Sequence, residues 1–104
     1  MKITLNNGTL HFAIAGDILS TNVQQLRPLL IAGIDQNPDT TSVVVDLASC
    51  KTIDSVGLNL LIALYRECEK RKLKFRIINP SDKITQLLTF LNLTERFGIN
   101  TSAS

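Results

Sequence analysis

The chain has 104 residues, of which 44% are hydrophobic and 19% charged, and its formal net charge is +2. This length suits one small domain with a single core, and the composition is unlike that of a disordered chain. The charge is too small to indicate a nucleic-acid partner, no apolar run is long enough to cross a membrane, and the first residues lack the apolar core of a signal peptide.

The first part of the chain predicts a β-hairpin. Residues Lys2–Leu5 and Thr9–Ala15 have the pattern of strands, and Asn6-Asn7-Gly8 between them is a strong hairpin signal. In the second strand, alternation puts Leu10, Phe12 and Ile14 on one face and His11 on the other, less buried face.

A turn over residues 16–20 leads to the first predicted helix. Thr21 and Gln24 resemble a capping box at its start. Its apolar stripe comprises Val23, Leu26, Leu30 and Ile34, with Leu29 beside it. Pro28 removes one helical hydrogen bond, at a cost of about 3 kcal/mol in a helix interior. We therefore expect either a kink near Gln24 or an irregular first turn.

The middle of the chain carries the most informative junction. Ser42–Leu47 contains three consecutive valines and predicts a central strand, covered on both faces. Helical spacing of apolar residues then begins near Ser55 and continues to about Arg71. Asp54 and Ser55 are both preferred N-cap residues, so Ser55 can be explained as a helix cap. Gly57 lowers helix propensity in the first turn, which suggests close backbone approach or access to the Ser55 hydroxyl.

The last third predicts a strand, a helix and a short final helix. The strand is Lys74–Ile78, and Ser81 caps a helix that runs to Asn92. The apolar side of this helix comprises Ile84, Leu87, Leu88 and Leu91. A short helix over Thr94–Phe97 is expected to turn Phe97 inward, and residues 100–104 are expected to form a frayed tail. The predicted order is β-β-α-β-α-β-α-α, an α/β fold with a small mixed sheet and helices mostly on one face.

Catalysis and metal binding fit this sequence poorly. His11 is the only histidine, Cys50 and Cys68 are far apart in the sequence, and no Gly-rich phosphate loop is present. Asp46 and Asp54 could suggest paired carboxylates, but each stands at a common turn or capping position. We therefore expect no enzyme, no metal, no cofactor, and free thiols in a cytoplasmic protein.

Four segments in order resemble the STAS domain family, the bacterial anti-sigma-factor antagonists. Asp54-Ser55-Val56-Gly57-Leu58 is similar to the family's Asp-Ser-x-Gly-Leu at a helix start, and Ala15–Ser20 resembles its Gly-Glu-Leu-Asp segment. The further matches are Ile78-Asn79-Pro80-Ser81, Leu87-Leu88, and Leu91-Asn92-Leu93 with Phe97-Gly98-Ile99. The resemblance spans roughly residues 9–99 and implies one STAS domain over 1–99.

The resemblance implies a regulatory site rather than a catalytic one. Ser55 falls on the family's phosphorylation site. The expected partner-binding residues are Asp17, Ser20, Thr21, Asp54, Val56, Gly57, Leu58 and Asn59. The implied partners are an anti-sigma factor with serine-kinase activity and a PP2C-type serine phosphatase, with no nucleic acid and no membrane insertion. The alternative is a constitutive interaction subunit of a lipid or anion transport system.

Three positions depart from the family pattern. Val56 stands where Ser or Thr is frequent, which leaves Ser55 as the one hydroxyl acceptor of the motif. Asn59 replaces a common Gly and could narrow the set of partners. Ser20 replaces a common Asp, which puts in doubt a polar contact between that loop and the surroundings of Ser55.

Overall fold

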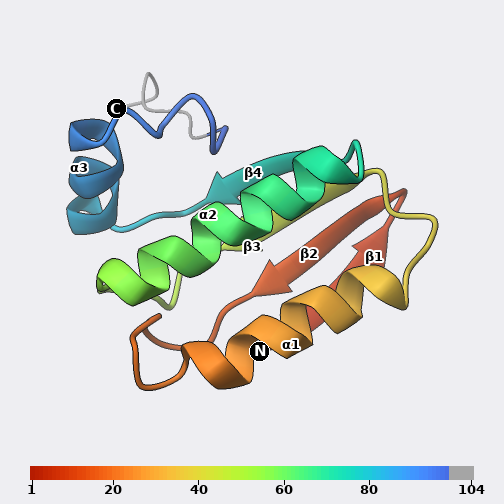
Figure 1. Cartoon of the computed structure of the whole chain (residues 1–104), viewed down its shortest axis with the longest axis horizontal. Helices are drawn as coiled ribbons and strands as arrows, with labels where there is room; N and C mark the ends of the chain where they lie inside the picture. The colour runs from red at the N-terminus through yellow and green to blue at the C-terminus, as the bar shows by residue number, and fades with distance from the viewer. Residues whose placement is uncertain (99–104) are drawn as a thin grey trace.

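The predicted strands and helices form in the expected order, except at the carboxyl end. The structure is a computed structural model that describes residues 1–98. Its elements are β1 Lys2–Asn6, β2 Thr9–Ala13, α1 Val23–Asp35, β3 Ser42–Asp46, α2 Ser55–Lys70, β4 Lys74–Ile78 and α3 Asp82–Phe90. The strands form a single four-stranded sheet in the order β1-β2-β3-β4 (Figure 1). The β1–β2 pair is antiparallel and the other two pairs are parallel, so the predicted mixed α/β sheet is confirmed.

The core lies between the sheet and two helices. α1 and α2 lie side by side over one face of the sheet, and α3 stands beyond the end of β4 (Figure 1). In register across the sheet, Phe12, Val45 and Ile77 face the helices and are almost fully buried. β3 is central, as the valine run predicts. On its opposite face Val44 lies between His11 and Arg76 and is only 4% exposed, although no helix of the described residues covers it.

The start of α1 differs from the prediction. The N-cap residue is Asn22 and no side chain caps the helix, so the expected capping box of Thr21 and Gln24 is wrong. Pro28 lies inside the helix. The first turn is irregular, because the amide groups of Gln25 and Leu26 both donate to the carbonyl of Asn22, one across three residues and one across four. Along the predicted stripe, Leu30 and Ile34 are buried, and Leu29, expected beside the stripe, is half exposed.

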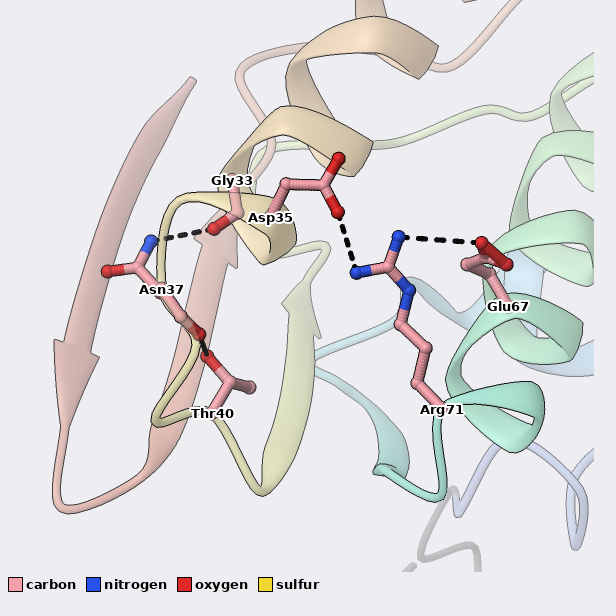
Figure 2. A network of polar contacts seen from close by, with 6 residues as sticks. All are labelled: Gly33, Asp35, Asn37, Thr40, Glu67 and Arg71. Carbon is pink, nitrogen blue, oxygen red and sulfur yellow. Dashed lines mark hydrogen bonds and ion pairs between the residues drawn. The ribbon is translucent and has the colours of Figure 1, made fainter.

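Polar contacts join the far ends of α1 and α2, away from the start of α2 (Figure 2). The Arg71 guanidinium lies 2.7 Å from the Asp35 carboxylate and 3.5 Å from that of Glu67. The hydrogen bond to Asp35 is the main reason that the pKa of Arg71 is raised. Exposed ion pairs contribute only about 0.2–1 kcal/mol. Apolar packing, rather than this network, therefore holds the two helices on the sheet.

The end of α3 differs from the prediction. α3 ends at Phe90 rather than Asn92, and Asn92 takes a left-handed conformation with φ 57° just after it. Amide groups of Asn92 and Leu93 bond back to the carbonyls of Thr89 and Leu88, which is a Schellman end. Leu91, expected on the apolar side, is 42% exposed.

The predicted final helix is a turn, because its few residues make only isolated backbone hydrogen bonds. Phe97 nevertheless points inward, as predicted, and is 1% exposed. Its carbonyl accepts a hydrogen bond from the Ile77 amide, so the turn closes the outer edge of β4. The predicted tail 100–104, together with Ile99, lies outside the described residues.

Candidate functional site

The candidate site lies where the loop between β2 and α1 meets the first turn of α2. Ile18 and Ile53 form an isolated parallel bridge between the two segments. The Ile18 amide donates to the Thr52 carbonyl, and the Asp54 amide donates to the Ile18 carbonyl. Residues 17–20 and 51–54 thus form a short parallel extension of the sheet, and this extension sets the position of the α2 start.

Asp54 is the N-cap of α2 and also links the two segments. Its Oδ1 accepts from the Gly57 amide at 2.8 Å, and its Oδ2 accepts from the Ser20 amide at 2.8 Å. These two backbone hydrogen bonds, Ser20 first, lower the pKa of the Asp54 carboxyl. The contact that the replacement of Asp at position 20 put in doubt therefore forms, because the backbone of Ser20 supplies the donor.

Asp17 and Asn22 hold the β2–α1 loop in place. One carboxylate oxygen of Asp17 accepts from the amides of Lys51 and Thr52, at 2.9 and 3.0 Å. The Asn22 side chain donates to the Asp17 carbonyl and accepts from the Leu19 amide. The Asp17 carboxylate therefore faces the neighbouring segment and acts as an anchor. Sequence analysis did not single out Asn22, although Asn just before a helix pattern is a common capping signal.

Gly57 lies against the backbone of the other segment. A Cβ placed there would lie 2.2 Å from the Ile18 carbonyl oxygen and 2.9 Å from a side-chain carbon of Ile53. Both distances are far below ordinary contact. Close backbone approach, one of the two explanations offered for this glycine, is thus what the geometry shows.

The outer surface of the site is formed by the residues around Ser55. Ser55 is the first residue of α2 and is exposed, and Val56 beside it is 43% exposed. The interpretation of Ser55 as the N-cap is wrong, because Asp54 occupies that position. Ser20, Thr21 and Asn59 are also exposed. Gly57 and Leu58 are buried and shape the site from beneath.

The remaining sequence candidates lie in other contacts. Asp46 accepts from the Ala48 amide and from the Asn79 side chain, and its other oxygen is 3.4 Å from His11. Asp46 and Asp54 therefore each have a separate structural role. His11 is about one-third exposed on the helix-free face, as alternation predicted. Within residues 1–98, no group of three or more His, Cys, Asp or Glu side chains is placed to hold a metal ion.

The first turn of α2 can accept a negative charge at Ser55. Helix amino ends carry a partial positive charge and unpaired amide groups. The Gly57 amide is taken by the Asp54 side chain and the Leu58 amide by the Asp54 carbonyl. The Val56 amide also interacts with the Asp54 carboxylate, whereas the Ser55 amide belongs to the first turn and has no intrahelical acceptor. A phosphoryl group on the Ser55 hydroxyl would therefore lie at the positive end of the helix, beside the Ser55 amide.

The lowered pKa of Asp54 leads to a prediction for its neutral analogue. Because the folded-state pKa lies below the unfolded value, the stabilisation by Asp54 is present above an unfolded pKa of about 3.9 and is lost as pH falls through the folded pKa. Asp54→Asn should therefore melt at a lower temperature than the parent chain at neutral pH, and the gap should narrow below about pH 4. Thermal melts of both chains between pH 3 and pH 7 measure this. A gap that does not change with pH would contradict the assigned role.

Comparisons with known proteins agree with this geometry. A family model described as STAS domain matches residues 1–104. No curated protein sequence matches the chain. No helix of the described part of the chain is long and apolar enough to cross a membrane.

Among solved structures, the chain is similar to an anti-sigma factor antagonist from Mycobacterium paratuberculosis, with TM-score 0.82 and 19% identity over 96% of this chain and 83% of that one. It is similar to the phosphorylated form of SpoIIAA, a Bacillus cell fate determinant, with TM-score 0.71 and 21% identity over 90% and 85%. It is also similar to a sulfate transporter family protein from Wolinella succinogenes, with TM-score 0.73 and 20% identity over 91% and 75%. At these identities the likeness establishes the fold.

Proposed function

The chain belongs to the STAS domain family, and from that premise we propose that it is a phospho-switched anti-sigma-factor antagonist. One observation carries the proposal: Ser55 is exposed at the first position of α2, beside the Asp54 cap and above the tightly packed Gly57. The hydroxyl is open to a kinase, while the backbone around it is held by contacts with the 17–20 loop. The chain itself has a binding role and catalyses no reaction.

In this proposal, the unphosphorylated surface binds an anti-sigma factor with serine-kinase activity in the cytoplasm. The contact surface comprises the exposed side chains of Ser20, Thr21, Ser55, Val56 and Asn59. Asp17, Asp54, Gly57 and Leu58 keep those side chains in position from inside the site.

Phosphorylation of Ser55 adds nearly two negative charges and three acceptor oxygens. The positive end of α2 stabilises these charges, so the domain keeps its fold. A partner docked over the α2 start meets added bulk and charge that it must desolvate, and it is released. A PP2C-type serine phosphatase would restore the binding form.

The likeness to a sulfate transporter family protein favours a second function, a constitutive interaction subunit of a transport system. In that case, the same surface binds its partner without a phosphorylation cycle. The two functions differ in one measurable respect, which is whether charge at Ser55 controls binding.

The test compares Ser55→Ala and Ser55→Asp in calorimetric binding to the purified kinase partner. We expect the Ala variant to bind like the parent chain, and the Asp variant to bind about 5–150-fold more weakly, which corresponds to about 1–3 kcal/mol for an unfavourable interfacial charge. Incubation of the parent chain with kinase and ATP should add one phosphate, and mass spectrometry should place it on Ser55. Both variants should melt near the parent temperature, because Ser55 is not the cap.

Ser49→Asp provides a matched control, since Ser49 is exposed on the loop between β3 and α2. It should leave partner affinity unchanged. Equal affinity of Ser55→Ala and Ser55→Asp, or phosphate on Ser49 or Thr52, would reject the switch. A stable complex with a transporter ATPase that is insensitive to Ser55→Asp would support the second function.

A further inference from the structure

The outer edge of β1 is the feature that the proposed function leaves unused. All five residues of β1 are exposed, and the strand lies at the margin of the molecule, as the faint red strand at the far left of Figure 2 shows. The opposite edge of the sheet is closed by the bond from the Ile77 amide to the Phe97 carbonyl. Within the described residues, no segment closes the β1 edge. An open strand edge offers unpaired backbone groups to another strand.

Apolar side chains border this edge. Ile3 and Leu5 pair in register with Phe12 and Leu10, so they face the helix layer, yet they are 39% and 41% exposed. Met1 is 37% exposed, and Leu29, one turn before the Ile3-facing Gly33 of α1, is 50% exposed. Exposed apolar residues are ordinary when scattered. Here Ile3 and Leu5 lie two residues apart on one face of β1, so they form an apolar row along this open edge.

The hairpin geometry determines which backbone groups point outward. Asn7 and Gly8 form a two-residue turn with φ of 51° and 83°, and Asn6 pairs with Thr9 across it. In such a hairpin the closing pair is hydrogen-bonded, and hydrogen-bonded positions then alternate along the strand. Lys2, Thr4 and Asn6 therefore bond to β2, and the amides and carbonyls of Ile3 and Leu5 point away from the sheet.

We propose that this edge is a self-association surface, at which β1 pairs antiparallel with β1 of a second copy around a two-fold axis at Thr4. The sequence Lys-Ile-Thr-Leu-Asn is close to palindromic in its pattern of polar and apolar residues. In this register Ile3 lies opposite Leu5 of the second copy, and both carry the outward backbone groups. Lys2 lies opposite Asn6 of the second copy, so no like charges face each other. The apolar row of each copy is covered by that of the other.

A second copy fits this edge better than an unrelated strand, because one register satisfies side chains and backbone on both sides at once. The pairing is isologous, as two-fold symmetry requires. It also leaves the proposed switch free, since α1 lies over the β1–β2 side and α2 over the β3–β4 side of the sheet (Figure 1). The dimer therefore presents two exposed Ser55 sites. If the chain does not dimerise, the proposed function at Ser55 is unaffected.

Disulfide trapping tests the register. In the proposed register Thr4 lies opposite Thr4 of the second copy, and this pair is not hydrogen-bonded because the Thr4 backbone groups bond to β2. The two Cα atoms of such an antiparallel pair are about 4.5 Å apart, within the range of a disulfide. Thr4→Cys should therefore give a covalent dimer on mild oxidation. The matched control is Lys2→Cys, whose thiols would be four residue steps, or about 13 Å, apart across the axis. It should stay monomeric on a non-reducing gel. Cys50 and Cys68 are buried and do not compete.

Sedimentation equilibrium of the parent chain tests the association itself. The average mass should rise from one chain to two with concentration. Ile3→Lys, which puts a charge into the apolar row, should weaken the association at least tenfold. Phe90→Lys, at an 81% exposed side chain of α3, should leave it unchanged. A parent chain that stays monomeric into the millimolar range, equal cross-linking of both cysteine variants, or equal association of both lysine variants would overturn the proposal.

Discussion

Replacing Gly57 by alanine is expected to destabilise the domain by about 2–3 kcal/mol, because overpacking against fixed backbone costs about 1–3 kcal/mol. The added Cβ would lie 2.2 Å from the Ile18 carbonyl oxygen. That oxygen also accepts from the Asp54 amide, so it cannot move away without breaking the link between the two segments. If Gly57 were only a tolerated helix glycine, the same change would stabilise by up to about 1 kcal/mol. The two explanations therefore predict changes of opposite sign in the free energy of unfolding.

Urea unfolding of Gly57→Ala and of the parent chain measures this difference. Asn59→Ala is the matched control, because Asn59 is exposed on the same helix two residues later. Alanine has the higher helix propensity, so this control should be neutral or stabilise by about 0.5 kcal/mol. A Gly57→Ala chain at least as stable as the parent would show that the contact with Ile18 is not as tight as described.

Replacing Phe97 by alanine should have the largest effect on stability, about 3–5 kcal/mol, as expected for a buried Phe that leaves a cavity. Phe97 is 1% exposed, and its ring centroid lies 5.7 Å from those of both Tyr65 and Phe75. The loss also weakens the turn that closes the β4 edge, since the Phe97 carbonyl accepts from the Ile77 amide. At the upper end of this range the loss approaches the whole stability of a small domain.

Phe90→Ala provides the control for residue type, because Phe90 is 81% exposed. Its unfolding free energy should stay within about 0.5 kcal/mol of the parent value, as for most surface changes. Guanidinium unfolding followed by circular dichroism compares the two variants. Similar losses for both, or a Phe97→Ala loss below about 1 kcal/mol, would contradict the assigned packing.

The local patterns in this sequence predicted elements reliably wherever neighbouring residues supply the cause. Asn7-Gly8 forms the hairpin because both residues accept positive φ, and the valine run occupies the central strand because both its faces are apolar. Ser81 caps α3 with its own hydroxyl, as its position before an apolar helical pattern indicates. The segment Thr94–Phe97 forms a turn rather than the predicted helix, because so few residues cannot show whether a 3.6-residue period continues.

At the candidate site, the sequence alone is insufficient to assign the role of each residue. The Asp-Ser-x-Gly pattern located the α2 start, but it could not distinguish Asp54 from Ser55 as the cap, since both side chains can accept an amide hydrogen bond. The structure assigns the cap to Asp54, because its Oδ1 accepts from the Gly57 amide, and its Oδ2 is held by the Ser20 amide from a segment 34 residues away. The same distant segment requires glycine at position 57, through the carbonyl of Ile18.

The sequence by itself determined the order of strands and helices, the mixed sheet and the position of the exposed serine, because these depend on periodicity and on residues adjacent in the chain. The tertiary structure alone decided the roles of Asp17, Asn22, Asp54 and Gly57, which depend on contacts between the 17–22 loop and the α2 start. It also decided which strand edge stays open, because Phe97 closes β4 and no described residue closes β1. Contacts between segments so far apart depend on how the chain folds back, and no local pattern encodes that.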